Sequence, residues 1–153
     1  MKYLVFVKVV KGELSPFDEA ALEVALELRD KTGGEVIVLT MAPDTASDRM
    51  KALTRLGVSS VLICDKAFAG SDTAATSYIL SLAAERFAGG EYLVLCGRQS
   101  MDGDTAQVGV SLAARLGIPA ITNVMQIPQI SDGRVSCVTR LGDESADLPA
   151  LLT

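Results

Sequence analysis

The sequence predicts an α/β protein built on a parallel, doubly wound sheet, with antiparallel strands added at the C-terminal end. Three observations indicate this class. Short β-rich runs alternate with longer segments of helical periodicity up to about residue 116. The runs are almost continuously apolar, which is typical of strands that are buried on both faces. After Pro119, strand-like segments follow one another with no helix between them. The length of 153 residues suits one domain, so we expect residues 1–153 to form a single domain.

The first strand is predicted over residues 3–9, and a helix follows it. Ser15 suits the N-cap of that helix, Pro16 its first position and Asp18 its first turn. Small and apolar residues then recur at helical spacing until Gly33-Gly34, where we expect the helix to end.

The next segments continue the same alternation of strands and helices. We expect, in chain order, a strand over 35–41, a helix through Met50, Leu53 and Leu56 that ends at Gly57, a strand over 60–64, a helix from Ser71 or Asp72 to about Phe87, a strand over 93–96 and a helix over roughly 105–116. Beyond Pro119 we expect strands over 121–127, 134–140 and 148–153, with a hairpin turn over 131–133.

Composition excludes several classes of function. The net charge is −5 and no basic stripe is visible, so nucleic-acid binding is not expected. No apolar run approaches the ~18 residues of a membrane helix, so we expect no membrane insertion. Strand-like sequence begins at Tyr3, and the three cysteines lack metal-ligand spacing, which favours a cytoplasmic protein with buried thiols. The absence of histidine removes imidazole-based triads and most zinc sites.

The stretch CGRQSMDGDTAQVG, residues 96–109, joins the predicted strand over 93–96 to the following helix. In open parallel sheets, ligands bind beyond the carboxyl ends of the strands, where this stretch lies. Asp104 and Gln107 have the spacing of a capping box, with Gln107 at the third helical position. The amides of the first turn would then lie at the positive end of the helix dipole, an arrangement that attracts phosphate.

Glycines and aspartates in this stretch support two readings. Gly97 and Gly103 would allow tight turns, and Gly109 would allow a ligand or a neighbouring strand to approach closely. Alternatively, Asp102 and Asp104 only form a turn and cap a helix. A general acid–base pair of these two carboxylates is disfavoured, because nothing nearby in the sequence supplies a partner.

Two further groups of polar residues are candidates for ligand contacts. Thr73, Thr76 and Ser77 occupy adjoining helical positions, so their hydroxyls could reach one ligand, or could belong to a capped and solvated first turn. Lys8 and Arg98 end their strands and are the cations best placed to meet phosphate, although either could be a solvated strand-end charge.

Residues 96–109, followed by Leu-Gly-Ile-Pro at 116–119, resemble the signature region of the β subunit of electron-transfer flavoproteins. Further similarity extends over nearly the whole chain, in Val7-Lys8, in Ser-Pro-Phe-Asp at 15–18, in the polar stretch at 69–77 and in Leu-Pro-Ala at 148–150. The chain resembles a shortened or truncated member of that family. It departs from the family where residues 10–14 replace a longer excursion, and at Ser15, where Asn is frequent.

The resemblance implies an adenine-nucleotide alpha-hydrolase-like fold and a carrier subunit rather than an enzyme. Such a β subunit pairs with an α subunit that carries FAD, and accepts electrons from dehydrogenases, acyl-CoA dehydrogenases among them. It buries AMP or a second FAD, and the polar stretch beginning at Asp72 resembles the electron-bifurcating branch, which favours FAD.

The resemblance also implies where the nucleotide lies. Adenine is expected near residues 6–8, 15–18 and 41, and ribose and phosphate within 97–109. The implied cofactor-binding residues are Phe6, Val7, Lys8, Ser15, Asp18, Met41, Thr73, Thr76, Gly97, Arg98, Gln99, Asp102, Gly103, Asp104, Thr105, Gln107, Val108 and Gly109.

Two other functions fit the sequence less well. A stand-alone adenine-nucleotide sensor resembling universal stress proteins would share the fold, but its glycine-rich stretch is not found in this sequence. A nucleotide-activating hydrolase or ligase would need a catalytic histidine or a Ser-Gly-Gly-x-Asp loop, and neither is present.

Overall fold

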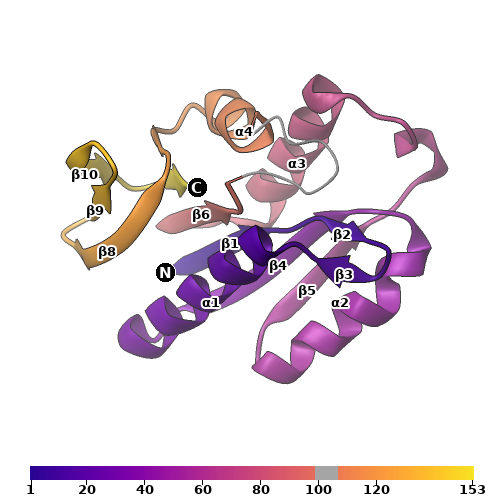
Figure 1. Cartoon of the computed structure of the whole chain (residues 1–153), viewed down its shortest axis with the longest axis horizontal. Helices are drawn as coiled ribbons and strands as arrows, with labels where there is room; N and C mark the ends of the chain where they lie inside the picture. Colours follow the sequence, from indigo (N-terminus) through magenta and orange to yellow (C-terminus); the bar gives the residue numbers. More distant parts are fainter. Residues whose placement is uncertain (99–106) are drawn as a thin grey trace.

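The computed structural model of the chain describes residues 1–98 and 107–153 (Figure 1). Its elements, with short 3₁₀ helices labelled η, are β1 (Lys2–Phe6), β2 (Val9–Val10), β3 (Glu13–Leu14), α1 (Pro16–Thr32), β4 (Glu35–Met41), η1 (Asp44–Ala46), α2 (Ser47–Leu53), η2 (Thr54–Leu56), β5 (Ser59–Ile63), η3 (Lys66–Phe68), α3 (Thr73–Phe87), β6 (Tyr92–Cys96), α4 (Val108–Leu116), β7 (Ala120–Ile121), β8 (Val124–Ser131), β9 (Arg134–Thr139), β10 (Gly142–Asp147) and β11 (Ala150–Leu152).

A parallel sheet forms the centre of the molecule. Within the described residues it has six strands in the order β5-β4-β1-β6-β11-β7. β1 lies between β4 and β6, with Leu4 opposite Ile37 on one side and Val94 on the other. The chain first builds outward from β1 through β4 to β5 and then returns to add β6 on the opposite side of β1. The strand order therefore reverses between β1 and β6.

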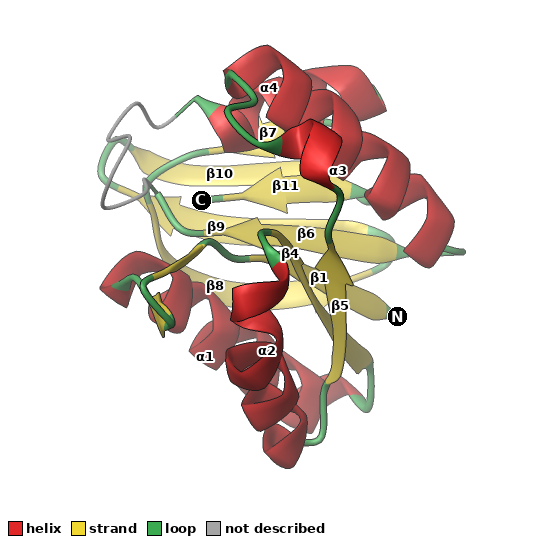
Figure 2. Cartoon of the chain, turned by 90° about the vertical axis from the view of Figure 1, so that its right-hand side faces the viewer, coloured by secondary structure: helices red, strands yellow, loops and turns green. Residues whose placement is uncertain are grey.

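Alternating side chains of the strands give the sheet two buried faces, and helices cover both (Figures 1 and 2). Tyr3 and Val5 face one layer, where they pack with buried residues of α1, α2, β9 and β10. Leu4 and Phe6 face the other layer, where they pack with buried residues of α3 and α4. The predicted doubly wound α/β class is confirmed.

The predicted helix ends are confirmed at several positions. Ser15 caps α1, because its Oγ accepts a hydrogen bond from the Asp18 N–H at 3.1 Å, and Pro16 occupies the first turn. Gly33, Gly57 and Gly117 end their helical segments in the left-handed conformation, with φ of 74°, 76° and 66°.

The segment between β1 and α1 differs from the single long strand that was predicted. β1 ends at Phe6, and β2 and β3 form a two-stranded hairpin with a turn at Lys11 and Gly12, both of which have positive φ. This short hairpin brings the chain from the carboxyl end of β1 to the start of α1.

The C-terminal strands divide between two sheets. β8, β9 and β10 form a separate antiparallel sheet, with the predicted hairpin turn at Asp132 and Gly133. The last strand was expected to belong to the antiparallel addition, and that expectation is wrong. β11 lies in the central sheet, parallel to both β6 and β7. The reason is β10, an unpredicted strand that returns the chain to the amino end of the sheet and so lets β11 run in the same direction as β6.

Candidate functional site

The carboxyl ends of β1 and β6 meet at the reversal of strand order, the position where open α/β sheets bind ligands. The buried Asp18 of α1 lies at this point. Its Oδ2 accepts a hydrogen bond from the Lys8 backbone N–H at 2.9 Å, and its carboxylate also accepts the Gly97 backbone N–H. One side chain of α1 therefore ties the segment after β1 to the segment after β6.

The electrostatics of this point are governed by burial. Burial raises the pKa of Asp18 above its ordinary value of 3.8, against the opposing effects of the Lys8 backbone, Ser15 and Gly97 hydrogen bonds and the Lys8 charge. Burial, with a smaller contribution from the Asp18 charge, raises the pKa of the neighbouring Cys96 thiol to about 12. Cys96 is therefore a protonated thiol at neutral pH and not a nucleophile.

Gly97 allows α1 to start against the end of β6. A Cβ on Gly97 would lie 2.9 Å from both the Asp18 nitrogen and the Phe17 carbonyl carbon, and would overlap the Asp18 Oδ1. The φ of Gly97 is not in the left-handed region, so the tight turn proposed from the sequence does not explain why this residue is glycine. The close approach of α1 to the end of β6 does explain it.

α4 begins three residues later than the capping box predicted. The Gln107 carbonyl accepts the first intrahelical bond, from the Ser111 N–H at 2.9 Å, so Gln107 is the N-cap and its side chain makes no capping hydrogen bond. The assignment of Gln107 to the third helical position is therefore wrong. A Cβ on Gly109 would lie 3.1 Å from Thr153 Cγ2, so here a neighbouring strand end makes the close approach.

Other predicted site residues lie at the same edge but on different faces of the sheet. Phe6 is buried in the α3/α4 layer, with Met41 and Val108 packed against the same cluster. Val7 is buried in the α1/α2 layer. Because these side chains lie on opposite faces of the sheet, a ligand that contacts all of them must span the end of β1 and cannot lie on a single face.

Thr73 and Thr76 lie in the first turn of α3, at the carboxyl edge because α3 follows β5 in a parallel sheet. Asp72 caps this helix by accepting the Ala75 N–H at 2.8 Å. Ser77 is buried and its Oγ accepts a hydrogen bond from Arg115 Nε at 2.9 Å. Ser77 therefore serves packing between α3 and α4, whereas Thr73 and Thr76 are partly exposed.

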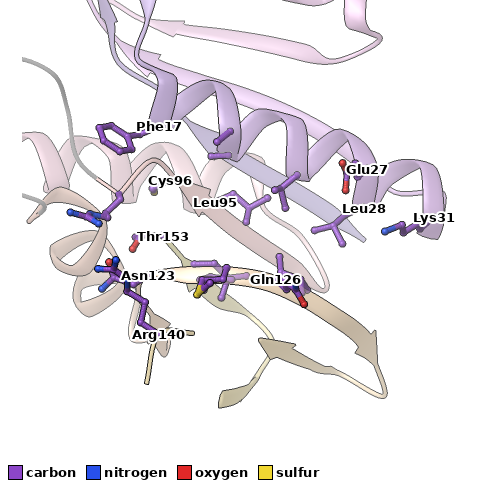
Figure 3. Close-up of a pocket in the computed structure, with 18 residues that line it drawn as sticks. Phe17, Glu27, Leu28, Lys31, Leu95, Cys96, Asn123, Gln126, Arg140 and Thr153 are labelled. Atoms are coloured by element: carbon purple, nitrogen blue, oxygen red, sulfur yellow. The ribbon is translucent and has the colours of Figure 1, made fainter. Parts of the chain in front are cut away.

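Five predicted site residues lie outside the described part of the chain: Gln99, Asp102, Gly103, Asp104 and Thr105. Arg98 is described and exposed, and it lines a cleft that sequence reasoning missed. The cleft has a volume of about 600 Å³ and lies between α1 and β8 (Figure 3). The available signal was a wide apolar stripe on α1, in which Phe17, Ala21 and Val24 flank core-facing positions such as Leu28.

The described residues contain no cluster of His, Cys, Asp or Glu side chains that could hold a metal ion. Over the same residues, every helix is too short or too polar to cross a membrane.

Comparison with known proteins agrees with this architecture. Residues 3–148 match the electron transfer flavoprotein domain. The chain is 44% identical to Protein FixA of Azorhizobium caulinodans over 150 residues, covering 92% of this chain and 53% of that protein. It is 44% identical to the electron transfer flavoprotein subunit beta of Thermoanaerobacterium thermosaccharolyticum, covering 77% and 45%. It is 41% identical to the Caffeyl-CoA reductase-Etf complex subunit CarD of Acetobacterium woodii, covering 94% and 56%. The chain thus spans about half the length of these relatives, and it belongs to the electron transfer flavoprotein domain family.

Proposed function

We propose that the chain is a single nucleotide-binding domain of an electron transfer flavoprotein β subunit, which binds AMP or FAD at the carboxyl edge of its sheet. The observation that carries the proposal is the reversal of strand order between β1 and β6, because open sheets bind nucleotides at that point. Family membership and relatives named as electron transfer subunits support the same function.

The residues at this edge suit an adenosine-bearing molecule. Phe6, Met41 and Val108 supply an apolar wall next to the ends of β1 and β4, which suits a flat base. The Lys8 side chain is exposed beside the same edge and adds a positive charge for phosphate. Asp18 carries the opposite charge, but its carboxylate is buried and tied to two backbone amides, so it does not face an anion across solvent.

All of the predicted site residues that the structure describes, except Arg98, have a place in this proposal. Phe6, Val7, Lys8, Ser15, Asp18 and Met41 surround the base, with Asp18 holding the backbone of Lys8 and Gly97 in place. Gln107, Val108 and Gly109 offer the start of α4 to the ribose and phosphate. Thr73 and Thr76 approach from α3 and would contact a molecule longer than AMP, which favours FAD.

A bound flavin would supply the redox chemistry, and the protein would bind it, orient it and exclude water. The protonated Cys96 thiol beside the site would not compete as a nucleophile. We further propose that the partner is a FAD-carrying α subunit, that dehydrogenases donate the electrons, and that the complex works in the cytoplasm.

The nucleotide that copurifies with the chain tests this function. The purified protein is denatured and the released small molecule is identified by chromatography and absorbance. AMP or FAD supports the proposal, and ATP would support a stress-protein-like sensor instead. No released nucleotide, together with no increase in melting temperature on adding AMP or FAD, would contradict both.

A pair of glutamine variants tests the site. Gln107→Ala should reduce nucleotide retention without unfolding the domain, because the Gln107 side chain is exposed and caps no helix. Gln129→Ala on β8 is the matched control, since that side chain bonds only to Ser131 within the described residues. Equal retention in the two variants would place the nucleotide elsewhere.

A further inference from the structure

We propose that the cleft between α1 and β8 is a second binding site, for an amphipathic organic anion of small-molecule size. Such an anion has a flat or chain-like apolar body and a carboxylate, phosphate or sulfonate at one end. The cleft begins at the carboxyl edge, where Cys96 ends β6 and Thr153 follows β11, and extends along α1 toward Lys31 (Figure 3). Its volume of about 600 Å³ is in the range of small-molecule sites, which is about 300–1,000 Å³.

One end of the cleft is cationic. Arg98 follows β6, Arg140 follows β9 and Asn123 precedes β8, so three separate segments bring donors to this end. Figure 3 shows Arg140 and Asn123 side by side there, near Thr153. Arg98 and Arg140 form no ion pair with residues 1–98 or 107–153. Two guanidinium groups that form no ion pair with the carboxylates of the described residues, in a protein of net charge −5, favour an anionic ligand.

The other end of the cleft fixes the orientation of such a ligand. Glu27 and Lys31 lie one turn apart on α1, at the spacing where opposite charges offset one another. That end therefore carries no net charge, whereas the Arg98 and Arg140 end carries two positive charges. The head group of the ligand belongs at the arginine end.

The walls between the two ends are apolar and remain partly open to solvent. Val24 and Leu28 of α1 and Met125 of β8 line the cleft together with the buried Leu95 and Leu152. Met125 is 65% exposed and Phe17, at the arginine end, is 37% exposed. An apolar body in the cleft would remove this surface from water, while its head group would meet the arginines.

Anilinonaphthalene sulfonate is a suitable probe, because it combines a flat apolar body with one anionic group and fluoresces when shielded from water. It is titrated into the folded 153-residue chain, and uncharged phenylnaphthylamine is titrated in parallel. We expect one sulfonate probe per chain. Arg140→Gln should weaken its binding about ten-fold, the effect of losing one charge-assisted contact, and leave the uncharged probe unaffected. Arg55→Gln, an exposed arginine of η2 outside the cleft, is the matched control.

Two more variants separate this site from the nucleotide site. Ala20→Phe should fill the cleft and block both probes, and the exposed position of Ala20 on α1 tolerates a larger side chain. Lys8→Gln should weaken AMP binding and leave the sulfonate probe bound, because Lys8 does not line the cleft. If AMP fails to bind, the proposed function fails while the cleft proposal stands.

Three results would overturn the proposal. Unchanged sulfonate affinity in Arg140→Gln and Ala20→Phe would show that the probe binds elsewhere. Displacement of the probe by AMP would make the cleft part of the nucleotide site. A loss of probe binding as the chain self-associates in sedimentation experiments would show that a second copy of the chain occupies the cleft.

Discussion

The backbone of Gly97 packs directly against Asp18, so that the end of β6 and the start of α1 leave no room for a side chain between them. Gly97→Ala should therefore lower the free energy of unfolding by about 2 kcal/mol, the usual cost of overpacking. The methyl group would press on the Asp18 nitrogen and the Phe17 carbonyl carbon, backbone atoms that cannot rotate away. Urea unfolding followed by circular dichroism measures the change.

Gly70→Ala provides the comparison for this substitution. Gly70 has a φ of +72° and open space around its Cα. Alanine at this position should therefore lower the free energy of unfolding by about 1 kcal/mol, which is the cost of placing alanine in the left-handed conformation. If Gly97→Ala lowers the free energy of unfolding by no more than Gly70→Ala does, the proposed overpacking at Gly97 is wrong.

The buried carboxyl group of Asp18 should make stability depend on pH. Its pKa is higher in the folded protein than the ordinary 3.8, so the folded state binds the proton more tightly than the unfolded state. The stabilising contribution of this group is complete below pH 3.8 and is lost as the pH rises through the folded pKa. Relative to Asp18→Asn, the wild type should therefore lose unfolding free energy as the pH increases from about 4.

Urea unfolding of both proteins across about pH 4 to 7 measures this difference. The unfolding free energies of the two proteins should also differ by an amount that does not depend on pH. The reason is that the asparagine side chain of the variant would present an amide donor to one of the two backbone N–H groups. Two curves that stay parallel over the whole range would show that Asp18 titrates at its ordinary value.

The three cysteines should differ sharply in their reactivity. Burial raises the pKa of Cys96 to about 12 and that of Cys137 to about 11, so neither forms thiolate near neutral pH, whereas Cys64 is exposed. Iodoacetamide at about pH 8 should alkylate Cys64 alone, as measured by peptide mass spectrometry. All three should react in urea, and fast labelling of Cys96 in the folded protein would contradict its raised pKa.

Arg115 should hold the start of α3 against the end of α4. Its Nε donates to Ser77 Oγ at 2.9 Å, its Nη2 donates to the Ala74 carbonyl at 3.1 Å, and its guanidinium carbon lies 5.5 Å from the centre of the Tyr78 ring. Arg115→Lys cannot reproduce this forked arrangement, so it should lower the free energy of unfolding by about 1 kcal/mol.

A double-mutant cycle with Ser77→Ala isolates one of these contacts. The losses of unfolding free energy in Arg115→Lys and Ser77→Ala should sum to more than the loss in the double variant, since each substitution removes the same hydrogen bond. Strict additivity would mean that the Nε to Oγ bond contributes nothing in solution.

Local chemistry made the first two-thirds of the fold predictable from sequence. Ser15, Gly33 and Gly117 act through side-chain capping or left-handed φ, which are properties of a few consecutive residues. β10 was not predictable in this way, because Gly-Asp-Glu-Ser-Ala-Asp has low β-propensity and forms a strand only through its pairing with β9. Missing β10 led directly to the wrong direction for β11.

The site was predictable in position but not in its tertiary contacts. The carboxyl ends of the strands follow from the order of elements, so Lys8 and Gly97 could be placed at one edge. The contact of Asp18 with both segments depends on how α1 crosses β1 and β6, which no local pattern specifies. The cleft depends on Arg98 and Arg140, which lie far apart in the sequence and carry no shared motif.

The position of β11 has a consequence for folding during synthesis. β11 consists of residues 150–152, yet it lies between β6 and β7, and β7 is joined to the sheet through it. The ribosome must therefore release residues 150–152 before β7 can dock, although β1, β4, β5 and β6 emerge much earlier. Until then one edge of β6 has no strand partner in the nascent chain. The order of the strands therefore requires this side of the sheet to assemble late.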